Sequence, residues 1–340
     1  MTLGKYPELS LKAAREARDN TRTLISQGID PMAERKKQGD LTGDSFKSVA
    51  EEWRLGRSHI LSPVSVKNIA QRLHTYVYPS IGSRPIADIK APELLQLIRS
   101  IETKGHFETA HRVRGIVSEV FRYAIALGKT ERDVANDIKG ALKPLIKKHL
   151  AAITEPVNAG QLLRKIHTYS GTPVVRAALK LAPLIFVRPI ELRTAKWDEI
   201  NFETAEWRYT ITKTNTPHIV PLARQALSII ESLQPITGKH AFIFPSHRRG
   251  NNPMSNNAIL TALRKMGYAK SEMSGHGFRA MARTMLDEIL GYRVDIIEHQ
   301  LGHVPRDFQG RAYNRTKHLG ERKLMMQAWA DYLDQLKGNN

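Results

Sequence analysis

The sequence predicts a mainly α-helical protein with a small antiparallel sheet. Apolar residues recur at the three-to-four-residue spacing of amphipathic helices over most of the chain. Two short β-rich runs, EWRYTIT and HIVPL, lie on either side of a turn at residues 213–217. Apolar residues make up 41% of the 340 residues, which is enough to build more than one hydrophobic core.

The first part of the chain, residues 1–43, contains one predicted helix and a polar linker. SLKAAREARDNTRTLISQG has helical apolar spacing, with Ser10 as the expected N-cap and Gly28 as the expected stop. The following run, AERKKQGDLTGD, is charged and contains glycine, as linkers do.

Two predicted domains follow. Residues 44–140 contain four amphipathic helices, of which ETAHRVRGIVSEVFRYAIALGK is the clearest. Residues 141–156, with two prolines and a KKH run, are the expected connector. Residues 157–340 form a second, mainly helical domain that contains the two strands.

The charge balance indicates a polyanionic partner. Lys and Arg number 52 against 33 acidic residues, a formal net charge of +19. A membrane surface is a poorer partner, because no apolar run approaches the roughly 18 residues that span a bilayer and no basic amphipathic helix dominates.

The chain has no cysteine, which excludes disulfides and thiolate metal sites. Its N-terminus lacks an apolar secretory core, so we expect it to stay in the cytoplasm.

Four residues of a C-terminal stretch suggest phosphate chemistry. His276 and Arg279 open the helical run HGFRAMARTMLDEI, His303 lies in LGH, and Tyr313 lies in AYNR. Arginine does not ligate metals and no carboxylate joins the set, so a metal site is a poor interpretation. Arginine binds phosphate oxygens through paired donors, imidazole transfers protons near neutral pH, and a phenol can attack phosphorus.

With HGFR, LGH and AYNR, the sequence resembles the tyrosine recombinases, or phage integrases, in particular the satellite-phage type of prophage and genomic-island integrases. Two upstream segments complete the resemblance. LIFVRPIELRTAKW supplies Arg188 and Glu191, and KTNTPHIVPL supplies Lys213 in the predicted turn. The family's six catalytic positions then fall on Arg188, Lys213, His276, Arg279, His303 and Tyr313.

The resemblance implies a fold and a reaction. It implies a helical SAM-like core-binding domain at 44–140, a catalytic domain of the DNA breaking-rejoining fold at 157–340, and in 1–43 a remnant of an arm-binding domain. The chain would then be a site-specific integrase that inserts and excises a prophage or genomic island. Tyr313 would attack a DNA phosphodiester and form a 3′-phosphotyrosyl intermediate, without a cofactor or a metal.

The resemblance also implies roles for the other site residues. Arg188 and Arg279 would stabilise the phosphorane, His276 would handle the nucleophile's proton, and His303 would donate to a phosphate oxygen. Lys213 would protonate the leaving 5′-oxygen. Glu191 would orient a neighbouring side chain.

The expected partners follow from the same resemblance. They are double-stranded attachment-site DNA, further copies of the chain in a tetramer on that DNA, and DNA-bending accessory proteins in the nucleoid of a bacterial cytoplasm. Five basic residues of the central helices are candidate phosphate contacts, although charge on solvated helix faces is the simpler explanation for them. They are Lys67, Arg72, Arg112, Arg114 and Arg122.

Three alternatives remain open from sequence alone. A type IB topoisomerase shares the covalent chemistry but rejoins the same strand, and a DNA-binding regulator could keep the fold without the chemistry. The C-terminal stripe could pack in the chain's own core or on a neighbouring subunit. Its residues are Leu324, Met325, Ala328, Trp329, Tyr332, Leu333 and Leu336.

Overall fold

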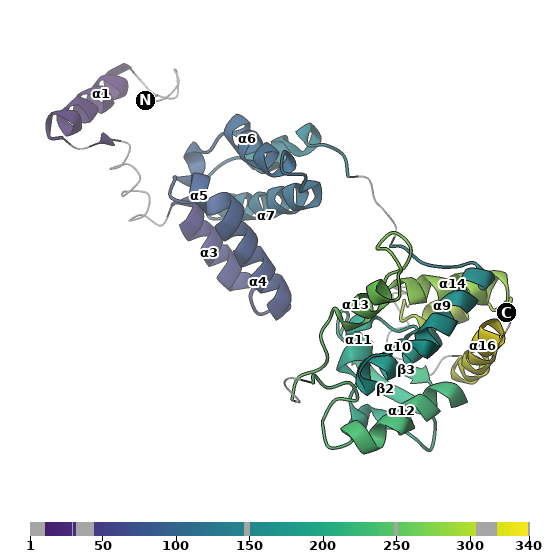
Figure 1. Cartoon of the computed structure of the whole chain (residues 1–340). Coiled ribbons are helices and arrows are strands. Elements are labelled where there is room, and N and C mark those ends of the chain that lie inside the picture. Colours follow the sequence, from purple (N-terminus) through teal and green to yellow (C-terminus); the bar gives the residue numbers. More distant parts are fainter. Residues whose placement is uncertain are drawn as a thin grey trace. The chain divides into compact units, whose positions relative to one another are not determined.

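A computed structural model describes residues 11–28, 30–31, 44–145, 150–247, 251–303 and 318–338. The chain divides into two compact units, Met1–Lys147 and Lys148–Asn340 (Figure 1). Most described residues are helical, and the sheet among them has three antiparallel strands in the order β1-β2-β3. The predicted fold class, mainly α with a small antiparallel sheet, is confirmed.

Helix α1 (Leu11–Ser26) is the predicted first helix, and Gly28 follows it with a left-handed φ of 73°. Only glycine adopts this conformation without strain, so Gly28 ends the helix as expected. Leu11 and Ile25 keep more than half of their surface exposed. Ser10, the expected N-cap, lies outside the described residues.

The helices of the N-terminal unit after α1 enclose one apolar core. Phe46 and Phe121 pack there with ring centroids 6.0 Å apart, beside Trp53 and Leu94. Ser45 and Ser62 cap two of the helices by accepting backbone N–H groups at 3.2 Å. The elements are α3 (Phe46–Arg57), α4 (Pro63–Arg72), a π-helical turn (Leu73–Val77), α5 (Tyr78–Ile81), α6 (Ala91–Glu102), α7 (Phe107–Ala126) and α8 (Val134–Asp137), with 3-10 turns at Ile86–Asp88 and Lys139–Ala141.

The C-terminal unit packs helices around the small sheet (Figure 1). Its elements are α9 (Pro156–Thr168), α10 (Pro173–Ile185), α11 (Pro189–Thr194), a 3-10 turn (Trp197–Glu199), β1 (Ile200–Asn201), β2 (Glu206–Ile211), β3 (Thr216–Pro221), α12 (Arg224–Thr237), α13 (Ala258–Lys265), α14 (Gly277–Glu288), α15 (Val294–Gln300) and α16 (Leu319–Gly338). Helix α13 has Asn257 as its N-cap residue.

The register of the β2–β3 hairpin places two polar residues opposite each other on the buried face. Tyr209 of β2 pairs with His218 of β3, and their rings meet edge to face at 5.6 Å. Trp207 stacks on Tyr209 at 4.4 Å on the same face. A one-residue slip of β2 would move Trp207 and Tyr209 to the other face, so their burial fixes the register.

Helix α10 ends in a left-handed residue that is not glycine. Phe186 has φ 36° and ψ 36°, and its N–H bonds to Ala182 O at 3.1 Å. A bulky residue in this conformation is strained and persists only where packing holds it. Phe186 is fully buried against Trp329, with ring centroids 6.3 Å apart. The strained residue turns the chain so that Arg188 stands at the start of α11.

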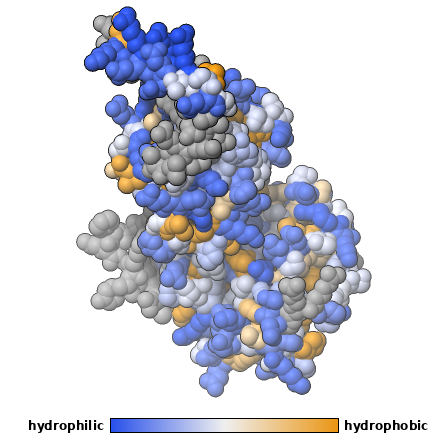
Figure 2. All heavy atoms as spheres, turned by 90° about the vertical axis from the view of Figure 1, so that its left-hand side faces the viewer, coloured by the Kyte–Doolittle hydropathy of each residue, from blue (hydrophilic) through white to orange (hydrophobic). Residues whose placement is uncertain are grey.

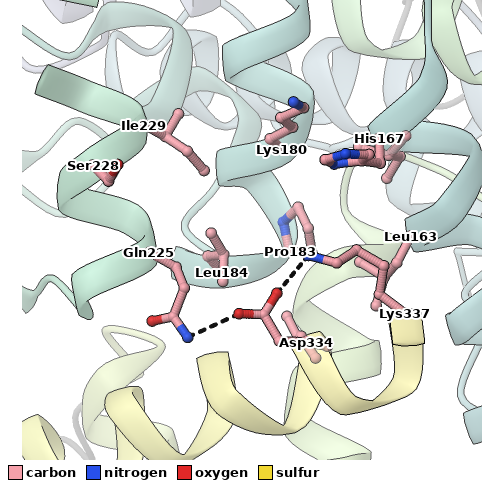
Figure 3. Close-up of a pocket in the computed structure, with 12 residues that line it drawn as sticks. Leu163, His167, Lys180, Pro183, Leu184, Gln225, Ser228, Ile229, Asp334 and Lys337 are labelled. Atoms are coloured by element: carbon pink, nitrogen blue, oxygen red, sulfur yellow. Dashed lines mark hydrogen bonds and ion pairs between the residues drawn. The ribbon is translucent and has the colours of Figure 1, made fainter. Parts of the chain in front are cut away.

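Helix α16 packs within its own unit against α9, α10 and α12. Trp329 is fully buried and donates its Nε1–H to Pro183 O at 2.9 Å. Asp334 of α16 accepts from Gln225 of α12 at 3.0 Å, which ties the two helices together, and from Lys337 of its own helix at 2.6 Å (Figure 3). Leu324 is 72% exposed and therefore does not belong to the apolar stripe, whose inner members include Met325, Trp329 and Leu333. In the structure of the single chain, the stripe packs in the chain's own core and not on a neighbouring subunit.

Hydrophilic residues cover most of the face shown in Figure 2, with small, scattered hydrophobic patches. Among the described helices, none is both long and apolar enough to cross a membrane.

Replacing Trp329 by Ala tests whether α16 belongs to its own core. Loss of a fully buried indole should reduce the free energy of unfolding by about 3–5 kcal/mol. Leu324→Ala, on the exposed side of the same helix, should cost less than about 0.5 kcal/mol. Urea unfolding of both variants, repeated over a hundredfold range of protein concentration without DNA, makes the comparison. A midpoint that rises with concentration would contradict packing within one chain.

Candidate active site

Arg188 is held in place by a buried carboxylate. The Glu191 side chain is 1% exposed, and Glu191 accepts from the Arg188 Nη1 and backbone N–H, both at 2.9 Å. The Tyr209 hydroxyl also donates to Glu191, at 3.1 Å, and burial raises the pKa of Tyr209 far above its usual value. Glu191 therefore orients Arg188 from one turn further along α11.

Of the predicted catalytic residues that the structure describes, Arg279 is the most completely buried. It is 9% exposed, and it donates from Nη1 to Phe186 O at 3.1 Å and from Nη2 to Leu301 O at 2.7 Å. Its Nη2 also lies 3.1 Å from His303 Nε2. Burial, and then the nearby charge of Arg188, lower the pKa of Arg279 to about 10. Two guanidinium groups thus lie close together, and the carboxylates of Glu191 and Glu298 both act on Arg279.

His303 is positioned by the way α15 ends. Gly302 adopts a left-handed φ of 67°, its N–H bonds to His299 O at 3.1 Å, and the His303 N–H bonds to Glu298 O at 2.9 Å. These two bonds form a Schellman motif, which explains the glycine of LGH. A side chain at Gly302 would also come within 2.7 Å of Ile211. Glu298 Oε2 contacts His303 Nδ1 at 2.8 Å, so both ring nitrogens have partners.

His276 is the N-cap residue of α14, and Arg279 follows one turn later on the same helix face. Partial loss of hydration, together with the charges of Arg279 and Arg188, lowers the pKa of His276 below its usual value. Gly277 lets the chain at Ala151 approach the start of α14, because a Cβ there would lie 2.6 Å from Ala151 O. Ser274 Oγ donates to the same carbonyl at 3.0 Å.

The structure brings together Arg188, His276, Arg279 and His303, which are four of the six predicted catalytic residues. Lys213 is exposed on the β2–β3 turn and has no hydrogen bond or ion pair with another described residue. Tyr313 lies outside the described residues. The predicted turn itself is present, with Asn215 in a left-handed conformation at φ 52° and its N–H bonded to Ile211 O at 2.8 Å.

Sequence reasoning missed several groups that support the cluster. His218 is buried and its Nε2 lies 3.1 Å from Gln300 O, a carbonyl that can only accept, so Nε2 carries the proton. Burial, and then the charge of Arg322, lower the pKa of His218 to about 3, so it is neutral at pH 7. Tyr209 and Glu298 were missed as well. A tyrosine on the apolar face of a predicted strand was a usable signal, because a buried hydroxyl needs a partner.

The five basic candidates of the N-terminal unit differ in their surroundings. Lys67, Arg112 and Arg122 are exposed, and Arg72 is half-buried at the end of α4. Arg112 pairs with Glu108 at 2.6 Å. Arg114 is half-buried and donates to Ala135 O at 3.4 Å, which links α7 to α8.

Two further observations concern metal ligands and the cavity of the C-terminal unit. Within the described ranges, no three His, Asp or Glu side chains are grouped as metal ligands would be. The cavity in Figure 3, between α9, α10, α12 and α16, is lined by none of the six predicted catalytic residues.

Comparison with known families matches the chain along nearly its whole length. The model described as phage integrase family matches residues 154–318, that described as phage integrase central domain matches 46–141, and that described as arm DNA-binding domain matches 1–38. Putative protein IntB of Escherichia coli strain K12 is 36% identical over 352 residues, covering 98% of this chain and 88% of the relative. The integrase of Enterobacteria phage P4 is also 36% identical, covering 98% of this chain and 80% of the relative.

Solved structures share the fold at lower identity. A lambda integrase(75-356) dimer bound to a COC′ core site has a TM-score of 0.62 at 19% identity, covering 77% of this chain and 96% of that one. The Tn1549 transposon integrase in complex with transposon right end DNA has a TM-score of 0.59 at 12% identity, covering 82% of this chain and 99% of that one. With curated relatives above 30% identity over almost its full length, the chain belongs to the phage integrase family and is a tyrosine recombinase.

Proposed function

We propose that this recombinase integrates and excises a prophage or genomic island at attachment sites in double-stranded DNA, through a 3′-phosphotyrosyl bond to Tyr313. The observation that carries the proposal is the pair of guanidinium groups, Arg188 and Arg279, held by Glu191 and by two backbone carbonyls. Glu191 pairs with Arg188, and Glu298 contacts His303 and Arg283, whereas Arg279 donates to backbone carbonyls. A DNA phosphate would supply the acceptor of opposite charge that Arg279 lacks among the described residues.

The proposed reaction is a transesterification. The Tyr313 oxygen forms a bond to phosphorus, the bond from phosphorus to the 5′-oxygen breaks, and that oxygen leaves as a 5′-hydroxyl. A 5′-hydroxyl of a second duplex then attacks the phosphotyrosine and releases the phenol, which exchanges the strands. Each step exchanges one phosphoester for another, so the bond energy is retained without ATP.

The two arginines and His303 would stabilise the phosphorane. Its non-bridging oxygens carry more negative charge than the starting diester, and each well-aimed donor contributes about 3–4 kcal/mol in such sites. Arg279 is fixed before the reaction by Phe186 O and Leu301 O, so it needs little reorganisation when DNA binds. His303 would donate to the same phosphate from Nε2, which faces the donor Arg279 Nη2 in the structure and must carry a proton for this role.

Proton transfer would fall to His276 and Lys213. Ionising a phenol of pKa ~10 at pH 7 costs about 4 kcal/mol, so a base near the nucleophile lowers the barrier. The lowered pKa of His276 keeps its imidazole neutral and able to accept that proton. Lys213, on the exposed β2–β3 turn, would protonate the leaving 5′-oxygen when the turn contacts DNA.

We propose that the chain acts as a tetramer on DNA. A related lambda integrase is described as a dimer bound to a COC′ core site and as a tetramer bound to a Holliday junction. In the present chain, 44–140 would bind core-type DNA, and 141–156 would link it to the catalytic domain. The phosphate contacts of 44–140 would be Lys67, Arg72, Arg112, Arg114 and Arg122. Residues 1–43 would belong to an arm-binding domain, and accessory proteins would bend the DNA in the bacterial nucleoid.

A nicked attachment-site duplex should trap the covalent intermediate. Loss of the short cleaved strand prevents religation, so protein linked to DNA accumulates and can be mapped by digestion and mass spectrometry. We expect the nucleotide on Tyr313, no adduct with Tyr313→Phe, and an undiminished yield in EDTA.

Two attachment-site duplexes given to the wild-type protein distinguish recombination from relaxation. Recombinant junctions support the integrase, whereas relaxed plasmid without junctions would indicate topoisomerase-like action. An adduct on another side chain, or unchanged activity of Tyr313→Phe, would contradict the proposed nucleophile.

Arg279→Lys should slow adduct formation about 10²–10³-fold at saturating DNA, because lysine keeps the charge but loses the paired donors. Single-turnover cleavage measures the rate, and DNA affinity should change little because many phosphates share the binding. Arg293→Lys, which alters an exposed arginine paired with Asp295, is the matched control and should cleave at the wild-type rate. Equal rates for both variants would remove Arg279 from the mechanism.

The pH dependence of cleavage should report His276. At subsaturating DNA, kcat/KM follows the free enzyme, in which the pKa of His276 lies below 6.5. A base works when neutral, so the rate should hold as pH falls to 6.5 and decline only below it. His276→Gln should be slow and should lack this acid limb. An acid limb centred above pH 6.5, or one that persists in His276→Gln, would contradict the assignment.

A further inference from the structure

Arg322, in the first turn of α16, is a fully buried guanidinium with no carboxylate among its hydrogen-bond partners. Burial lowers its pKa to about 10, so it remains charged at neutral pH. Burying an uncompensated charge is costly, and arginine is seldom buried this completely in a helix that has an exposed side. Packing alone gives no reason for a cation at this position.

The contacts of Arg322 join three elements. Its Nε and Nη2 donate to Gln300 Oε1 at 2.8 and 2.6 Å, at the end of α15. Its Nη2 also donates to Ile219 O in β3, and its Nη1 lies 3.5 Å from His299 Nδ1. The planar guanidinium sets the spacing and direction of these bonds together, which a flexible ammonium group cannot do.

Each partner of Arg322 is one residue away from a group that shapes the site. Gln300 precedes Leu301, whose carbonyl accepts from Arg279 at 2.7 Å. Ile219 follows His218, which donates to Gln300 O at 3.1 Å. Arg322 is therefore linked to Arg279 through its contact with the Gln300 side chain and through the backbone from Gln300 to the carbonyl of Leu301.

We infer that Arg322 is a positioning residue for the recombination chemistry: by fixing the end of α15 against β3, it places Leu301 O and His303 around Arg279. It does not touch the reacting atoms. The same contacts hold the end of α15 beside the start of α16, which are the described elements on either side of Tyr313 in the sequence. The inference rests on the proposed function, because it concerns the rate at which that site cleaves DNA.

The test must separate positioning from stability. Arg322→Met leaves Gln300 Oε1 without a donor inside the protein and should be strongly destabilised. The double variant Arg322→Met/Gln300→Leu removes the guanidinium together with its side-chain acceptor Gln300 Oε1, so that Ile219 O is the backbone acceptor that loses this donor. It also removes the Gln300 Nε2 group, which is already buried without a partner. Replacing both members of such a pair by apolar groups restores much of the stability. Arg322→Lys keeps the positive charge but loses the planar set of N–H donors.

Three measurements on full-length protein decide the matter: the urea midpoint, the dissociation constant for an attachment-site duplex, and the single-turnover rate of adduct formation on the nicked duplex. We expect the double variant and Arg322→Lys to bind DNA within about threefold of wild type and to form adduct at least tenfold more slowly. Arg224→Met, an exposed charge loss beside α16, is the control and should match wild type in all three.

The outcomes separate the two proposals. Wild-type cleavage rates in Arg322→Lys and in the stable double variant overturn the positioning role and leave the proposed function intact. A rate that recovers in step with stability across the variants also overturns it, because the role would then be structural. No adduct on Tyr313 in the wild-type protein overturns the proposed function, and the inference falls with it.

Discussion

The arrangement of the site depends on the burial of one arginine. Arg279 can be buried only because Phe186 and Leu301 present their carbonyls to it, and both carbonyls come from irregular ends of helices. Helix α10 ends in a strained left-handed phenylalanine and α15 ends in a Schellman motif. In a regular helix these oxygens would bond to the backbone four residues on. The ends of two helices thus supply the acceptors that a buried guanidinium requires.

Electrostatics explains why the cluster suits an anion. Arg188, Arg279 and Arg322 contribute three guanidinium groups to the interior of one unit. Among the residues that the structure describes, only Glu191 forms an ion pair with one of them, Arg188. The lowered pKa of Arg279 and the lowered pKa of His218 have the same origin, because each loses hydration close to another positive charge. The neutral state of His218 limits this repulsion. A phosphate bound to Arg188 and Arg279 would reduce it further, so the binding of substrate and the relief of repulsion favour the same state.

The sequence was sufficient for the helices, the hairpin and the residues that carry motifs. Amphipathic spacing predicts α7, and a glycine at the right distance predicts the end of α1. The contacts that support the site could not be predicted, since each joins residues distant in sequence. Tyr209 meets His218 only because of the register of the hairpin, and Arg322 reaches Gln300 only after α16 has packed. Arg322 lies in the run ERKLMM, where a charged residue is ordinarily solvent-exposed, so its burial contradicts the usual preference. Leu324 shows the opposite error, because an apolar residue beside the stripe proved to be exposed.

Helix α16 packs in the core and also supports the site, which limits how the helix can take part in assembly. Its second half buries Trp329 and Leu333 in the core, while its first turn carries Arg322 to β3 and α15. Removing the helix from its unit would expose the indole and leave Gln300 Oε1 and Ile219 O without the donor that they share. Such unpaired buried acceptors each cost about 1–3 kcal/mol, in addition to the lost apolar contact. Any transfer of α16 to a neighbouring subunit must therefore replace both kinds of contact, or the site around Arg279 loses its support when the helix leaves.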